Sequence, residues 1–448
     1  MSPRTFNTHG LLKLPLELLQ EICRELQDRN DDDDDDYSDT QEDFDDNNPE
    51  HIKDLARVAL TSRVLYLAAN PILWESLPGL EPLLDLMPPE AWDESAIKAR
   101  YDTPKDPASK TRPLPDFWAP VRKLADLVKR ICIFPIPSRL QTMIMLARPL
   151  QKLLPRVTTV YLVQDKERRL EFKNGCADHY LKFLKFIVPF SGITDLNIDH
   201  SHSLALSQAR FPQLKLLVEY SYKSNLGPEA VIDASQHRDA QLDLARSIIT
   251  YQHLRHLDMA FSFGPNEEFL EGLARLQQLA FLRVGFDQVD ESDQTSWIGR
   301  QPKYPADAFP ALEFLELDDV AFADATAILQ SCPKRPNLRS IVIESVELEP
   351  STALLALTES IKRVCDPAVL AEVHLGRDAP LMEEFYDASF DWPLTFEHVE
   401  PLSAISGLET IGFGGFCGMT ITEEQWAQLD RSWPNLLVRE VHGNYADF

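Results

Sequence analysis

Apolar residues recur along most of the chain in a six-residue pattern, apolar-x-x-apolar-x-apolar, where x is any residue. Leu254, Leu257 and Met259 form one copy. The last part of each copy alternates with a period of two, which is typical of a short β-strand with one buried face. The copies start at Val128, Val157, Ile193, Leu214, Leu254, Leu279, Leu312, Leu338, Leu370, Leu408 and Leu436, and those at Leu214 and Leu436 are the weakest.

Helical patterns fill the segments between these short strands. They cover residues 179–188, 242–250, 267–276, 323–330 and 353–364. One strand and one helix per unit, with starts 21 to 40 residues apart, predict a solenoid in which each unit packs on the next. The units resemble irregular leucine-rich repeats, whose regular form has ~20–29 residues. The consensus asparagine or cysteine is absent, because Val320 and Val346 stand at that position. An unrelated α/β sheet protein with short strands is the alternative.

The N-terminal part has helical rather than strand periodicity. Leu18, Leu19, Ile22 and Leu26 recur at the spacing of one helix face, in a segment that opens with Leu14 and a proline. Residues 54–70 predict two short helices with a break around Thr61-Ser62, followed by a turn at 71–74 that carries a tryptophan.

The strings LPLELLQEICREL and DLARVALTSRVLYLAANPILW resemble the F-box motif over residues 14–77. The resemblance implies a three-helix module that binds the Skp-type adaptor of cullin–RING ubiquitin ligases. For Leu18, Leu26 and Leu60 a place in the module's own core is the favoured interpretation. The residues implied to form or brace the adaptor surface are Leu14, Pro15, Leu19, Ile22, Leu55, Val58, Arg63, Leu73 and Trp74.

The chain departs from the F-box pattern between the first two helices, where residues 27–53 replace a short loop. Residues 31–46 alone hold 11 acidic side chains and no basic one. Such a run of like charges predicts a disordered, solvated insertion. A calcium loop of the EF-hand type needs a central glycine, which this run lacks, so metal binding is not expected there.

Charge and cysteine content narrow the classes of function. The net charge of −27 argues against nucleic-acid binding, which needs clustered lysine and arginine. The six cysteines are far apart, and no signal peptide or membrane-spanning stretch is evident, so we expect a cytoplasmic or nuclear protein. His200, His202, His253 and His256 have no acidic or cysteine cluster beside them, so no metal and no cofactor is expected. Catalytic motifs are absent, and the chain is not expected to be an enzyme.

Together these patterns predict an α/β fold class with three regions. An F-box-like helical module spans 11–77 with its acidic insertion at 27–53, a proline-rich linker or cap spans 78–120, and an irregular, curved leucine-rich-repeat solenoid spans 121–448. Phe117 and Trp118 are expected to close the open end of the solenoid. The fungal type of F-box protein with leucine-rich repeats is the family that the chain resembles.

The function implied is substrate recognition in a cullin–RING ubiquitin ligase, with a non-ligase scaffold as the alternative. The target protein is expected on the solvent side of the strands, where alternating residues point away from the core. Aromatic and arginine side chains there are typical of binding hot spots, although burial of Phe281 and Phe314 under a neighbouring segment is the alternative. The predicted target-binding residues are His256, Asp258, Phe281, Arg283, Phe314 and Glu316.

Overall fold

The structure is a computed structural model. It describes residues 14–28, 49–87, 119–133, 141, 144, 152–163, 176–199, 206, 209–220, 234–261, 267–286, 304, 308–331, 337–345, 349–376 and 390–443. The chain divides into two compact units, Met1–Ile193 and Thr194–Phe448, which are taken in turn. The expected roles of Phe117, Trp118 and residues 31–46 lie outside the described residues.

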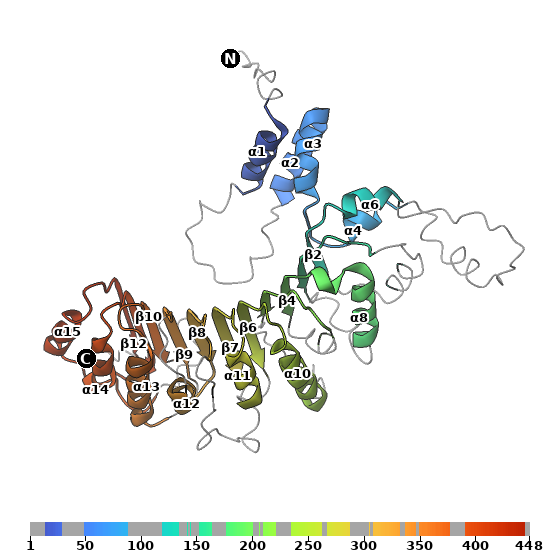
Figure 1. Cartoon of the computed structure of the whole chain (residues 1–448). Coiled ribbons are helices and arrows are strands. Elements are labelled where there is room, and N and C mark those ends of the chain that lie inside the picture. The colour runs from blue at the N-terminus through green and yellow to red at the C-terminus, as the bar shows by residue number, and fades with distance from the viewer. Residues whose placement is uncertain are drawn as a thin grey trace, which may run out of the picture. The chain divides into compact units, whose positions relative to one another are not determined.

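The first unit begins with a module of three helices, α1 (Leu16–Asp28), α2 (Pro49–Thr61) and α3 (Arg63–Leu73) (Figure 1). The predicted break at Thr61-Ser62 is confirmed, because the Ser62 hydroxyl caps α3 by accepting a hydrogen bond from the Leu65 N–H at 3.2 Å. The predicted turn at Pro71 is wrong. Pro71 lies inside α3, which continues to Leu73.

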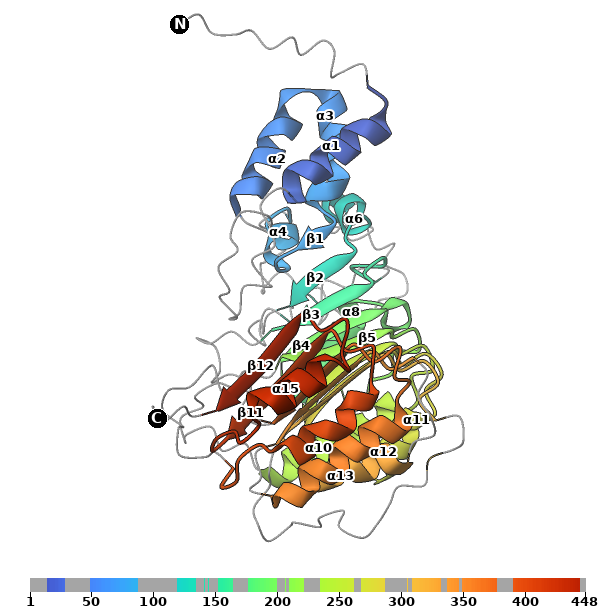
Figure 2. The ribbon, with the colours of Figure 1, turned by 90° about the vertical axis from the view of Figure 1, so that its left-hand side faces the viewer.

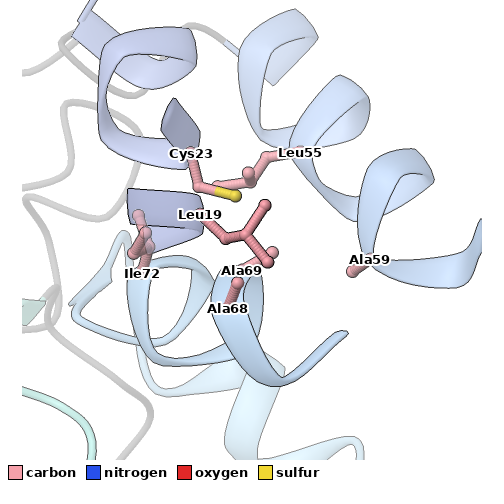
Figure 3. Packing of buried hydrophobic residues seen from close by; sticks show 7 residues of the cluster. All are labelled: Leu19, Cys23, Leu55, Ala59, Ala68, Ala69 and Ile72. Atoms are coloured by element: carbon pink, nitrogen blue, oxygen red, sulfur yellow. The ribbon is translucent and has the colours of Figure 1, made fainter. Parts of the chain in front are cut away.

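The core of this module consists largely of small side chains. In Figure 3, Leu19, Cys23 and Leu55 point toward one another and toward Ala68 and Ala69 of α3. All five side chains are buried. Alanine and cysteine at these positions allow the three helix backbones to approach closely, so the core needs few large residues.

The chain leaves α3 directly into β1 (Ser76–Leu77), which pairs in parallel with β2 (Arg130–Ile133), and β2 pairs in parallel with β3 (Thr159–Leu162). Within the predicted linker, the short helix α4 (Glu81–Leu84) buries Leu83 and Leu84, so this part of the linker is folded. The remaining described elements of the first unit are α6 (Ala119–Ala125), α8 (Cys176–Ile187) and the 3-10 helix η5 (Phe190–Gly192).

In the second unit the strands are parallel and follow one another in chain order. From β5 onward a helix lies between each strand and the next, except between β7 and β8, where the described residues include no helix. Figures 1 and 2 show α10 to α13 on the same side of the strands. The strands are β4 (Asp195–Asp199), β5 (Leu216–Tyr220), β6 (His256–Phe261), β7 (Phe281–Phe286), β8 (Phe314–Asp318), β9 (Ser340–Glu344), β10 (Glu372–Gly376), β11 (Thr410–Phe416) and β12 (Val438–Gly443). The helices are α10 (Ala234–Ile248), α11 (Glu267–Ala274), α12 (Phe322–Ser331), α13 (Ser351–Val364), α14 (Phe396–Val399), η9 (Glu400–Ala404) and α15 (Glu423–Asp430).

The predicted six-residue pattern sets the register of these strands. Leu257 of β6 pairs with Leu282 of β7, which pairs with Leu315 of β8, and all three are buried. The residues that alternate with the apolar positions of the pattern along these three strands, such as His256, Arg283 and Phe314, are half-buried or exposed. Each of these strands thus has one core face and one solvent face. The strand predictions are therefore confirmed for these repeats.

Neighbouring repeats are also joined by a backbone ladder just before each strand. The Arg255 carbonyl, for example, accepts hydrogen bonds from the Ala280 and Phe281 N–H groups at 2.8 and 3.0 Å. This arrangement uses only main-chain atoms, so it explains how successive repeats can stay aligned although the consensus asparagine is absent. Within the two units, the carbonyls that accept in this way belong to Glu75, Lys129, Thr194, Lys215, Arg255, Ala280, Glu313, Arg339, Ala371 and Glu409.

Candidate functional site

The three-helix module leaves large apolar side chains in solvent. Leu18 of α1 is 52% exposed, Leu60 of α2 is 85% exposed and Leu67 of α3 is 51% exposed. The favoured core interpretation of Leu18 and Leu60 is therefore wrong, and the side chain of Leu26 lies outside the described residues. We call the exposed apolar set Leu16, Leu18, Ile22, Leu60, Val64, Tyr66 and Leu67.

The nine residues predicted for adaptor binding divide into three groups. Leu19 and Leu55 are buried in the module's core, where they brace the helices. Leu14 and Leu73 pack against that core and are partly buried. Of the others, Val58 and Trp74 are half-buried, and Pro15, Ile22 and Arg63 are exposed. The sequence analysis did not assign four members of the exposed apolar set to the adaptor surface, namely Leu16, Val64, Tyr66 and Leu67. The helical spacing of Val64 and Leu67 is the signal that could have found these two.

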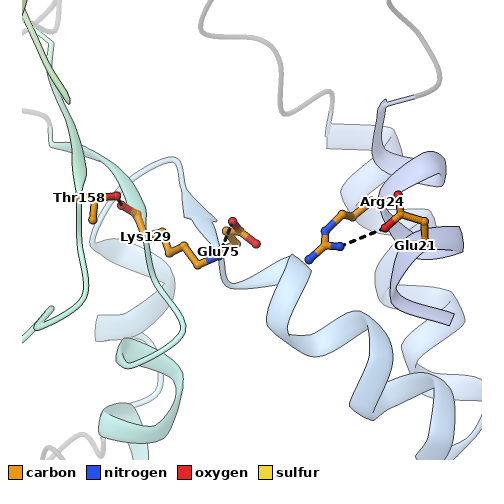
Figure 4. A network of polar contacts seen from close by, with 5 residues as sticks. All are labelled: Glu21, Arg24, Glu75, Lys129 and Thr158. Atoms are coloured by element: carbon orange, nitrogen blue, oxygen red, sulfur yellow. Dashed lines mark hydrogen bonds and ion pairs between the residues drawn. The ribbon is translucent and has the colours of Figure 1, made fainter. Parts of the chain in front are cut away.

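Polar contacts fix the exit of the chain from this module (Figure 4). The Glu75 carboxylate, just after α3, forms an ion pair with the Lys129 ammonium at 2.9 Å. The Glu75 carbonyl accepts hydrogen bonds from the N–H groups of Lys129 and Arg130. The Lys129 carbonyl in turn accepts from the Thr158 hydroxyl at 3.5 Å. On α1, Arg24 pairs with Glu21 at 3.2 Å, an exposed contact within one helix turn. These contacts link Glu75 to Lys129, just before β2, and Lys129 to Thr158, just before β3.

The six residues predicted for target binding lie side by side on the solvent face of β6, β7 and β8. His256, Phe281 and Phe314 are register partners, and we call them the aromatic row. The rings of His256 and Phe281 are stacked with centroids 4.0 Å apart, and those of Phe281 and Phe314 are 5.9 Å apart. Phe314 is 39% exposed and Phe281 is half-buried, so neither ring belongs to the core between strands and helices.

A cluster of charges lies two residues further along the same strands. The Arg283 Nε atom lies 2.9 Å from Asp318 Oδ2, 3.2 Å from Glu316 Oε1 and 3.8 Å from Asp258 Oδ1. We call these four residues the ionic cluster. Asp318 was missed by sequence reasoning, which considered only two outward positions per strand. The small residues Gly285 and Ala260 beside it leave room for this third position.

Burial and repulsion between neighbouring carboxylates favour the neutral forms of Glu316 and Asp258. Loss of solvent raises the pKa of Glu316 to about 7 and that of Asp258 to about 6, and Arg283 only partly opposes this. The carboxylates in turn raise the pKa of Arg283, although burial alone would lower it. Burial lowers the pKa of His256, which favours the neutral ring.

Further along the sheet, His374 of β10 pairs with Glu372 at 3.3 Å, and this contact is the main cause of the lowered pKa of Glu372. The ring of His374 lies over Gly412, where a Cβ atom would fall 2.2 Å from Nδ1. This part of the face is therefore flatter and carries no exposed aromatic ring comparable to Phe314 among the described residues.

Among the described residues, no group of three or more histidine, cysteine, aspartate or glutamate side chains is arranged to hold a metal ion. In the same part of the chain, no helix combines the length and the apolar character that crossing a bilayer demands. No protein-family model matches the chain, and no curated protein matches it significantly.

Proposed function

We propose that this chain is the substrate-recognition subunit of an F-box-type cullin–RING ubiquitin ligase. In this role, the helices α1, α2 and α3 bind the Skp-type adaptor, and the solvent face of the repeats binds the target protein. The ubiquitin is transferred by other subunits. The exposed apolar set on the three-helix module is the observation that carries the proposal.

Leucine side chains in solvent leave favourable free energy of burial unused. Full burial of a leucine side chain stabilises it by roughly 1.5–3 kcal/mol relative to solvent, so Leu18, Leu60 and Leu67 together represent several kilocalories of unused burial. Large exposed apolar patches mark protein interfaces, and the exposed apolar set on these three short helices is a candidate for such a surface. A protein partner that covers these leucines would gain this free energy of burial on binding.

The identity of that partner comes from the F-box resemblance of residues 14–77. The structure adds a reason for the sequence pattern. Leu19 and Leu55 brace the helices from inside, while Pro15 and Ile22 remain accessible on α1. A conventional adaptor interface needs both a rigid support and accessible apolar anchors.

The experiment replaces three members of the exposed apolar set in the full chain, Leu18→Ser, Leu60→Ser and Leu67→Ser. We expect binding to a purified Skp-type adaptor to weaken by about 100-fold, since loss of interface anchors costs several kcal/mol. The melting temperature should stay the same, because these side chains are exposed in the free protein. Binding is measured by calorimetry.

The matched control is Leu437→Ser, which removes a leucine that is 81% exposed in the second unit. It should leave adaptor binding unchanged. Equal adaptor affinity of the triple variant and the unchanged protein would reject the F-box assignment. Capture of the adaptor from cells without a cullin would instead favour a scaffold outside the ligase.

A further inference from the structure

The solvent face of β6, β7 and β8 combines exposed rings with an excess of negative charge. The aromatic row lies at the start of the strands, and the ionic cluster lies two residues along. Two residues in a parallel strand span about 6.6 Å, so an apolar strip and an acidic strip run beside each other across the strands. The fold itself needs no exposed ring at Phe314.

The charges within the cluster do not balance. Asp258, Glu316 and Asp318 contribute −3 when ionised and Arg283 contributes +1, which leaves −2. Glu219 of β5 and Glu344 of β9 add to the repulsion felt by Asp258 and Glu316, respectively. Burial is the largest cause of the raised pKa values of Asp258 and Glu316, and repulsion from the neighbouring carboxylates adds to it.

This negative net charge decides the sign of the charge that the partner carries. An acidic or phosphorylated segment would have to displace a carboxylate from Arg283 and then lie against the remaining ones. A basic side chain would meet three carboxylates that share a single guanidinium. Repulsion between like charges also excludes two other occupants of this face. One is the acidic segment 31–46 of this chain, and the other is a second copy of the chain, whose net charge is −27.

The spacing of the two strips decides the kind of basic side chain. Lysine and arginine carry a charged group at the end of an apolar stem, and the stem packs well on apolar surfaces. A stem lying over Phe281 and Phe314 would place its charged group near Asp258 and Glu316. The faces of the rings add a cation–π attraction.

We propose that the solvent face of β6, β7 and β8 binds a segment of the target protein through a lysine or arginine, with the stem on the aromatic row and the charge at the ionic cluster. This deepens the target-binding role under the proposed function by naming the chemistry of the target. The segment is apolar next to its basic residue, because Phe314 offers surface beyond a single stem.

The test selects ligands from a random peptide library displayed on phage, with the purified full chain as bait. We expect enrichment of peptides that carry lysine or arginine beside an apolar residue. In fluorescence titrations at pH 7.5, the double variant Asp258→Asn, Glu316→Gln should bind such a peptide about tenfold more weakly, as for loss of close charge pairs. The variant Phe281→Ser, Phe314→Ser should weaken binding as well.

The matched control is Glu423→Gln, Glu424→Gln, which removes the same formal charge from exposed positions on α15 and should leave peptide affinity unchanged. Enrichment of acidic peptides, absence of enrichment, or equal affinity for the Asp258/Glu316 variant would each overturn the proposal. If the ring variant unfolds early, the charge variant alone decides. Because the selection uses the chain without adaptor, failure to bind the adaptor would reject the ligase role and leave this result intact.

Discussion

In the helices α1 to α3, several leucines lie in solvent around a core in which small side chains predominate, whereas in the repeats most leucines of the six-residue pattern lie inside and charged residues lie outside. Ala68, Ala69 and Cys23 occupy the centre of the module, and Leu60 is in solvent. In the repeats, Leu257 and Leu282 are buried between strands and helices. The same residue type thus serves two purposes, since burial stabilises the fold and exposure offers a surface to a partner.

This difference bears on how each region is stabilised. A repeat gains its stability from contacts with the repeats on either side, so stability accumulates along the array. The module has a small core, and covering its exposed apolar set by a partner would raise its stability through linkage with binding. We therefore expect mutations to have different consequences in the two regions.

The largest effect is expected from Leu282→Ala in β7, which should lower the free energy of unfolding by about 2–5 kcal/mol because it leaves a cavity in the repeat core. Leu60→Ala in α2 removes the same atoms from solvent and should change it by less than about 0.5 kcal/mol. Urea unfolding of the full chain measures both. Similar losses for the two variants would mean that the module buries Leu60 after all.

A smaller effect is expected from the caps of two helices. Glu349, between β9 and α13, accepts the Ala323 N–H at 3.0 Å and also the Phe322 N–H, at the start of α12. Ser62 caps α3 from the position directly before the helix. Each alanine variant should cost about 1 kcal/mol, with the larger cost at Glu349 because two N–H groups lose their acceptor.

Hydrogen exchange of the α12 amides is the measurement for Glu349→Ala. Glu349→Gln is the control, since it keeps an acceptor and loses only the charge that favours a helix N-terminus. Equal exchange rates in Glu349→Ala and the unchanged chain would show that the cap contributes nothing to the contact between repeats.

The smallest effect concerns pH and tests the charged face alone. In the unfolded chain, Glu316 and Asp258 ionise near their ordinary pKa values of 4.5 and 3.8, whereas in the fold they keep protons up to about 7 and 6. The native state therefore binds more protons between these limits, and the free energy of unfolding falls as the pH rises through this window. Glu316→Gln should make the melting temperature less dependent on pH between 5 and 7.5. A steeper dependence in the variant would contradict the direction of the shift.

The repeats could be predicted closely because their signal is local. The predicted helix at 323–330 corresponds to α12 (Phe322–Ser331), and the one at 353–364 to α13 (Ser351–Val364). The alternation around Leu282 sets which side chains face solvent, and the parallel register then brings His256, Phe281 and Phe314 together. The grouping of the six predicted target residues follows from that register.

The face of each helix in the module could not be predicted in the same way. Helical spacing grouped Leu18 with Leu19, Ile22 and Leu26, but the structure buries Leu19 with Cys23 and leaves Leu18 and Ile22 exposed. One turn of sequence offers two overlapping apolar faces. The choice depends on the small residues of the opposing helices, Ala68 and Ala69, which contact only in the folded module.

The amino-acid sequence by itself determined the strands of the repeats, several of the helices between them and the outward position of Arg283, because these depend on spacing along one segment. Only the tertiary structure decided what Arg283 does there. Its three carboxylate partners come from β6 and β8, and Asp318 is the register partner of Gly285, two residues beyond Arg283 in β7. Charge balance at a surface depends on residues that are distant in sequence, and it therefore appears only when neighbouring strands are in register.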